Sequence, residues 1–148
     1  MVNTYHRLFF HCVWTTWDRE PLLTGEVERE AYALMRAQCA RMGATLHAIG
    51  GVADHVHLLV GLPTTLCLAD FAEAVKGVTS KALNDRALND KAPDDRRRSP
   101  AWAFKWRGGY SAFTVCAAHV PPVRRYIEGQ KRHHADHALW PSCEPDAT

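Results

Sequence analysis

The sequence lacks several patterns that would place it quickly in a class of proteins. Its five cysteines are scattered and never spaced as C-x-x-C, which argues against a disulfide scaffold and a thiolate zinc cluster. No segment is apolar over the roughly 20 residues that a membrane span needs, and the N-terminus has no signal-peptide cleavage site. There is no internal repeat or low-complexity tract. We therefore expect a cytoplasmic protein without membrane contact.

The chain also has no large excess of positive over negative charge. The formal net charge is only +2 over 148 residues, so composition alone does not indicate a nucleic-acid partner. A hydrophobic content of 47% with 23% charged residues is typical of a globular chain. We predict a single domain over 1–148 with its core at about 5–137.

Periodicity and turn residues predict alternating strands and helices. A strand is expected at 5–16, a helix from Thr24 to Gly43, two strands within 44–63 joined near 52–54, and a helix from about 66 to 83 or beyond. After these elements we expect an exposed connection (84–100), one or two strands broken at Gly108–Gly109, a final helix with Pro121 and Pro122 near its first turn, and a flexible tail (141–148). This order predicts an α+β, ferredoxin-like antiparallel sheet with helices on one face and an added C-terminal helix. The other face would be free for a ligand.

The run "DHVHLLV" at 54–60 places two histidines in a segment otherwise suited to a buried strand. Because side chains alternate along a strand, His55 and His57 point to the same face while Val56 points to the other. Two imidazoles on one face supply half of a metal site. Asp54 is expected mainly as a turn residue, with the alternative that it orients a ligand imidazole.

The final helix carries a second unusual pair. Tyr126 and Gln130 are four residues apart and share a helix face. A tyrosine hydroxyl is a nucleophile and a glutamine carbonyl is a neutral oxygen ligand. Together with His55 and His57 the pair would give a divalent cation, Mg²⁺ or Mn²⁺, three protein ligands.

This combination resembles the HUH endonucleases, and within them the single-tyrosine transposases of small bacterial insertion sequences. The similarity covers about residues 8 to 134, where "FHCVWTTWDREPLL", "ADHVHLLVGLP", "LADFAEAVKGVTSKAL", "WRGGYSAFTV" and "VRRYIEGQKRHH" occur in the family's order. The resemblance implies that His55, His57 and Gln130 bind the metal and that Tyr126 attacks DNA.

The resemblance also implies a substrate and a partner. Family members cut single-stranded DNA at hairpin-containing element ends, keep a 5′-phosphotyrosine link and leave a free 3′-hydroxyl. They are homodimers that can assemble each site from both chains. We expect two sheets to merge through their first strands, because a small sheet exposes its edges.

Several alternatives stay open. A domesticated, non-catalytic DNA-binding relative and a replication initiator or relaxase share the same site, although the latter are usually longer. Tyr5, Tyr32 and Tyr110 compete as nucleophiles but lack a paired glutamine. The residues His133, His134 and His137 could suggest zinc with the paired histidines, but no carboxylate or thiolate completes the set.

Basic residues supply candidate DNA contacts. They are Lys76 and Lys81 on the second helix, Arg96, Arg97 and Arg98 in the polar connection, and Arg124 and Arg125 beside the tyrosine. For each, a solvated surface role is the alternative.

Overall fold

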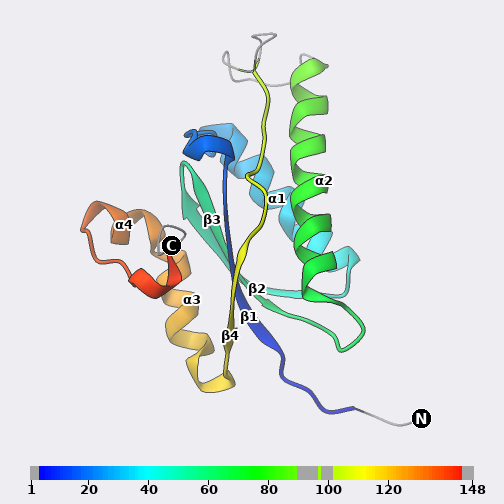
Figure 1. Ribbon diagram of the computed structural model, residues 1–148, viewed down its shortest axis with the longest axis vertical. Helices are drawn as coiled ribbons and strands as arrows, with labels where there is room; N and C mark the ends of the chain where they lie inside the picture. Colours follow the sequence, from blue (N-terminus) through cyan, green and yellow to red (C-terminus); the bar gives the residue numbers. More distant parts are fainter. Residues whose placement is uncertain (1–3, 90–96, 98–101, 145–148) are drawn as a thin grey trace.

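The computed structural model describes residues 4–89, 97 and 102–144. Its centre is a four-stranded antiparallel sheet with strand order β2-β3-β1-β4 (Figure 1). The strands are β1 (Phe9–Thr15), β2 (Thr45–Val52), β3 (His55–Gly61) and β4 (Ser111–Val115). The helices are α1 (Gly25–Arg41), α2 (Leu68–Leu88), α3 (Val120–Glu128) and α4 (Gln130–Ala135). The expected ferredoxin-like topology is confirmed.

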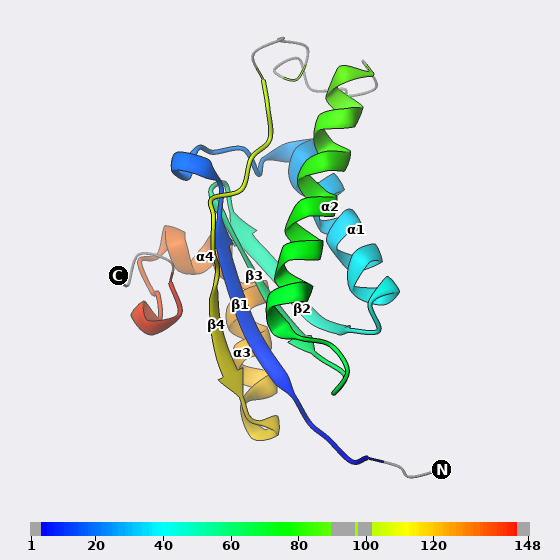
Figure 2. The same cartoon turned by 45° about the vertical axis from the view of Figure 1, so that its right-hand side comes forward.

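The two faces of the sheet are covered by different helices. α1 and α2 pack on one face, and α3 and α4 lie on the other (Figures 1 and 2). The main core lies between the sheet and the first two helices, with Cys12, Trp14, Val56, Leu58, Val60, Val27, Met35 and Phe71 among its members. A smaller cluster of Ala48, Leu59, Val115 and Ile127 attaches α3 to the opposite face. The face expected to be free for a ligand is therefore partly covered by the chain's own C-terminal helices.

The expectation that two sheets merge through their first strands is wrong. β1 is a central strand, because Phe9–Val13 pairs with β3 on one side and with β4 on the other. Directly after β1, Thr16 forms an isolated antiparallel bridge with Trp106 in the segment before β4. The outer strands of the sheet are β2 and β4.

The C-terminal helix differs from its predicted form. It is divided at Gly129 into α3 and α4, and Gly129 has the low helix propensity expected at such a break. The Gly129 N–H still donates to the Arg125 carbonyl at 3.0 Å, so the residues on either side remain one turn apart. The pair Tyr126 and Gln130 consequently stays together across the division.

Two segments predicted to lack regular structure, 84–100 and 141–148, contain some helix. α2 continues to Leu88, so the first residues of the expected connection 84–100 are helical. Within the stretch 141–148, Pro141–Cys143 form the short 3-10 helix η4, and Glu144 follows it. Among the described residues, no helix combines the length and the apolar character needed to cross a membrane.

Candidate active site

His55 and His57 lie side by side on the sheet face that α3 and α4 cover. In the register of the sheet, His55 is opposite Thr15 of β1 and His57 is opposite Val13. Both side chains are buried, at 1% and 0% exposure. The predicted alternation is thus present, and it directs two imidazoles to one place.

Each of these imidazoles has its Nδ1 atom engaged. His55 Nδ1 lies 2.7 Å from Asp54 Oδ1, and Asp54 is in turn held by Arg19 at 3.3 Å. His57 Nδ1 lies 2.8 Å from Nε2 of His11 on β1. A proton on Nδ1 leaves the Nε2 lone pair free, which is the arrangement that metal-binding histidines use. Asp54 therefore orients an imidazole in addition to standing in a turn.

Tyr126 projects from α3 toward the same histidines. Its ring centroid is 6.1 Å from that of His57, and the residue is 1% exposed. Trp140 stacks on the phenol ring at 4.2 Å with an interplanar angle of 6°, and His133 stacks at 5.0 Å. The Trp140 backbone N–H donates to the phenol oxygen at 3.0 Å. These contacts fix the direction of the hydroxyl.

The carboxylate of Glu144 connects the tyrosine with the histidines. The Tyr126 hydroxyl donates a short hydrogen bond to Oε1 of Glu144. The other oxygen, Oε2, lies 3.3 Å from His55 Nε2, 3.8 Å from His57 Nε2 and 3.4 Å from His134 Nε2. Ligand atoms of His55, His57 and Glu144 lie within 4.8 Å of one another, close enough to share one metal ion.

Burial and this carboxylate set the protonation states of the site. Burial lowers the pKa of His55, but the contacts with Asp54 and Glu144 outweigh it and the net pKa is raised. Burial and the neighbouring histidines hold the pKa of His57 well below its usual value. Burial, reinforced by the hydrogen bond to Glu144, raises the pKa of Tyr126 to about 12. The phenol is thus a protonated, weak nucleophile in this state.

Gln130 is buried next to Tyr126. Its Nε2 donates to the Tyr126 carbonyl at 3.4 Å, a long contact within the helix. Its Oε1 has no hydrogen-bond partner among the described residues, and neither do Nε2 of His55 and of His57. Buried polar atoms without partners are costly, and an imidazole nitrogen or amide oxygen in this position can coordinate a cation.

Sequence reasoning missed three residues of this site. His11 shares the face of His57 by strand alternation along β1, so the sequence contained that signal. His134 was considered for zinc and set aside for want of a carboxylate, which Glu144 now provides. Glu144 itself lies in a stretch expected to be a flexible tail, and no local pattern marks it.

Comparisons with known proteins identify the family of the chain. A family model described as "Transposase IS200 like" matches residues 4–130. The chain belongs to the IS200-like transposase family. The ISDra2 transposase TnpA of Deinococcus radiodurans is 25% identical over 126 residues, covering 84% of this chain and 85% of the relative.

Two solved structures share the fold of this IS200-like transposase. A transposase candidate from Deinococcus radiodurans R1 matches with a TM-score of 0.65 and 25% identity, over 88% of this chain and 95% of the other. A REP-associated tyrosine transposase bound to a REP hairpin matches with a TM-score of 0.60 and 13% identity, over 90% of this chain and 74% of the other. At that lower identity the second match supports the fold alone.

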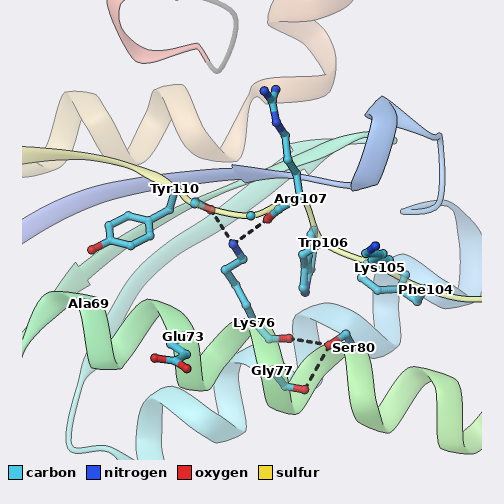
Figure 3. Close-up of a pocket in the computed structure, with 12 residues that line it drawn as sticks. Ala69, Glu73, Lys76, Gly77, Ser80, Phe104, Lys105, Trp106, Arg107 and Tyr110 are labelled. Carbon is cyan, nitrogen blue, oxygen red and sulfur yellow. Dashed lines mark hydrogen bonds between the residues drawn. The ribbon is translucent and has the colours of Figure 1, made fainter.

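Lys76, one of the predicted DNA contacts, uses two of its ammonium hydrogens in bonds within the protein. Its ammonium group donates to the carbonyls of Arg107 at 2.8 Å and Gly109 at 2.5 Å. Figure 3 shows the side chain reaching from α2 across a cavity of about 500 Å³ to the segment before β4. Lys76 therefore ties this segment to α2, and only part of its hydrogen-bonding capacity remains for DNA.

The other basic residues divide into two groups. Lys81 and Arg124 are exposed and pair with Asp85 at 2.6 Å and Glu128 at 2.9 Å; Arg125 is also exposed. Arg97 is 2% exposed, and its guanidinium pairs with Glu30 at 3.0 Å and lies over the Trp102 ring. This placement favours a structural role for Arg97. Arg96 and Arg98 lie outside the described residues.

Proposed function

We propose that this transposase is a metal-dependent single-stranded DNA endonuclease and strand transferase with Tyr126 as its nucleophile. One observation carries the proposal: a single carboxylate, that of Glu144, bridges the Tyr126 hydroxyl and the Nε2 atoms of His55 and His57. A phosphodiester is also a monoanion with two free oxygens. The position that Glu144 occupies therefore suits a scissile phosphate held between nucleophile and metal ligands.

The reaction would be a transesterification at phosphorus. The Tyr126 oxygen forms a bond to phosphorus while the bond from phosphorus to the 3′-oxygen breaks. The phenol loses the proton that the departing 3′-oxygen gains, so cleavage leaves a 5′-phosphotyrosine and a free 3′-hydroxyl. The reverse attack by a 3′-hydroxyl rejoins strands. No nucleotide hydrolysis is required, because the covalent link keeps the phosphodiester's energy.

The residues present suit a divalent cation, Mg²⁺ or Mn²⁺. His55 and His57 would hold it through the Nε2 atoms that now face Glu144, and the buried Gln130 Oε1 offers a further neutral oxygen. When bound, a cation neutralises charge on the phosphate and stabilises the charge that develops during attack. The low pKa of His57 keeps that imidazole neutral and able to act as a ligand.

Substrate must reach a hydroxyl that the chain now covers. Trp140 stacks on Tyr126 and Glu144 receives its hydrogen bond, which leaves the residue 1% exposed. The segment 138–144 therefore has to withdraw when a phosphate binds. A cavity of about 320 Å³ lies beside it, and its lining includes Phe113 of β4, which stays in place when the segment withdraws. Aromatic rings of this kind stack on unpaired bases, which supports a single-stranded substrate.

DNA affinity would come from the exposed cations. Lys81 and Arg124 form surface ion pairs that are worth at most about 1 kcal/mol each, so exchange for a phosphate costs little. We propose these two and Arg125 as phosphate contacts, with Lys76, Arg96, Arg97 and Arg98 as the remaining sequence-based candidates. Alanine substitution of a phosphate contact should reduce the salt dependence of binding.

We also propose that the active enzyme is a homodimer that acts on hairpin-containing element ends. The outer strands β2 and β4 are the sheet edges at which a second copy can pair. Sedimentation at micromolar concentration should show a dimer, and a monomer under all conditions would refute this part of the proposal.

The nucleophile is tested with single-stranded DNA from the region flanking the gene, labelled at its 3′ end and incubated with Mn²⁺. Wild-type protein and Tyr5→Phe, a control at an exposed tyrosine, should form a covalent adduct that survives denaturation. Tyr126→Phe should form none. An adduct that persists in Tyr126→Phe refutes the assignment. Binding without cleavage by the wild type under any divalent metal favours a non-catalytic DNA-binding relative instead.

A further inference from the structure

Four donor atoms converge beside Tyr126, more than the paired-histidine pattern supplies. They are Nε2 of His55, His57 and His134, and Oε2 of Glu144. The three nitrogens lie 3.3, 3.8 and 3.4 Å from the carboxylate oxygen. The rings of His55 and His134 are 4.9 Å apart, and those of His55 and His57 are 5.1 Å apart. Three of these donors, on His55, His57 and Glu144, lie within 4.8 Å of one another, and His134 adjoins the group through the Glu144 carboxylate.

The distances of the three imidazole nitrogens from Glu144 Oε2 resemble those between neighbouring donors in a coordination shell. With metal–ligand bonds of about 2.1 Å, neighbouring donors in a tetrahedral site are about 3.4 Å apart. The observed separations from Oε2 are close to that value. All three Nε2 atoms are buried and have no hydrogen-bond partner among the described residues. The three imidazole nitrogens face one carboxylate oxygen, so a cation held between them and that oxygen would be within reach of all four atoms.

The chain brings the two additional donors to this place by separate means. His134 projects from α4, which begins after the division at Gly129. Glu144 is delivered by the turn that follows α4, where Trp140 stacks on Tyr126 and η4 leads back toward the sheet. Two independent segments thus converge on the paired histidines.

We propose that His134 and Glu144 are metal ligands in the DNA-free enzyme, together with His55 and His57. This inference rests on the proposed function and extends its metal site. A set of three imidazoles and one carboxylate favours Mn²⁺ or Zn²⁺ over Mg²⁺, because imidazole suits transition metals better. It also means that a protein carboxylate holds the coordination position that a DNA phosphate must later take.

The test measures metal binding by calorimetry on the full chain without DNA, using MnCl₂, ZnCl₂ and MgCl₂. Glu144→Gln keeps the shape of the side chain and removes its charge, and His134→Ala removes one imidazole. Each should weaken Mn²⁺ binding at least about tenfold, as loss of a ligand costs at least what loss of a supporting group does. The controls Glu128→Gln and His137→Asn alter exposed residues outside the site and should bind as the wild type does.

A spectroscopic measurement gives a second, independent readout. The wild type loaded with Co²⁺ should show the intense visible absorption of a four-coordinate site, and Glu144→Gln should lose intensity or shift its bands. Circular dichroism without metal establishes that each variant is folded.

The results separate this inference from the proposed function. If Glu144→Gln and His134→Ala bind Mn²⁺ like their controls while His57→Ala has lost binding, the two additional ligands are refuted and the paired-histidine site stands. If His57→Ala also binds like the wild type, the metal site of the proposed function fails, and this inference fails with it. Reduced affinity in all three variants, with unchanged controls, supports the four-ligand site.

Discussion

Gly50 should control where the nucleophile lies. It sits on β2 opposite His57, on the sheet face that α3 covers. A Cβ atom added at Gly50 would lie 2.1 Å from the Ile127 carbonyl oxygen and 3.0 Å from its carbonyl carbon. Both are backbone atoms of α3, so rotation of a flexible side chain cannot relieve the contact. Tyr126 is the residue before Ile127 and moves with it.

The size of the effect follows from the geometry. Close carbon–oxygen contacts between backbones are about 3.3 Å, so Gly50→Ala must separate α3 from β2 by roughly 1 Å. Overpacking of this kind costs about 1–3 kcal/mol, which a domain of ordinary stability survives. A displacement of about 1 Å at a reacting group can reduce its rate about a hundredfold. We expect Gly50→Ala to fold, to be less stable, and to form the tyrosine–DNA adduct about a hundredfold more slowly.

Gly77→Ala is the matched control. Gly77 lies within α2, and a Cβ there meets nothing within 4 Å. The same chemical change should therefore raise the free energy of unfolding by up to about 1 kcal/mol and leave the adduct rate unchanged. Single-turnover adduct formation and urea denaturation measure both quantities for the two variants. Wild-type adduct formation by Gly50→Ala would refute the close approach of α3 to β2 as the determinant of the Tyr126 position.

Three further predictions concern pH, metal and a buried arginine. Burial lowers the pKa of His11 to about 4, so this side chain is neutral in the fold but protonates in the unfolded chain below about 6.5. The free energy of unfolding should therefore fall by roughly 3 kcal/mol as the pH falls from 6.5 to 4, and His11→Gln should flatten this part of the urea-denaturation profile. Mn²⁺ at a hundredfold excess over its dissociation constant should stabilise the protein by about 2.7 kcal/mol, seen as a raised melting temperature that EDTA reverses and His57→Ala lacks. Arg97→Ala should cost about 1–3 kcal/mol, because it removes a buried ion pair while Glu30 keeps Arg86 at 3.2 Å. An unchanged stability with weakened DNA binding would instead assign Arg97 to the DNA surface.

Local sequence rules were sufficient where the site depends on residues close together in the sequence. Strand alternation predicts that His55 and His57 share a face, and helical spacing predicts that Tyr126 and Gln130 are one turn apart. Both relations hold because they depend on backbone geometry that does not change with tertiary context. The ferredoxin-like order of strands and helices follows from the same periodicities.

Features that depend on several elements were beyond these rules. The residues adjacent to Glu144 in the sequence do not indicate that its carboxylate lies against the sheet. That placement depends on the stacking of Trp140 on the Tyr126 ring. The central position of β1 depends on which strands pair. The periodicity of a single strand does not determine its neighbours in the sheet. The internal partner of Arg97 likewise comes from α1, far away in the sequence.

If Tyr126 forms the covalent DNA link proposed above, the covered state of its hydroxyl has a physical consequence for substrate choice. Replacing the Glu144 carboxylate by a phosphodiester exchanges one negative charge for another, so the charge beside the histidines does not change. The exchange loses the ring contact with Trp140, worth about 0.5–1.5 kcal/mol, and hydrogen bonds of similar net value. A strand that also contacts exposed cations along several phosphates can offset a few kcal/mol, whereas an isolated anion cannot. Under the proposed function, we therefore expect the C-terminal segment to favour extended DNA over isolated anions before any bond is broken.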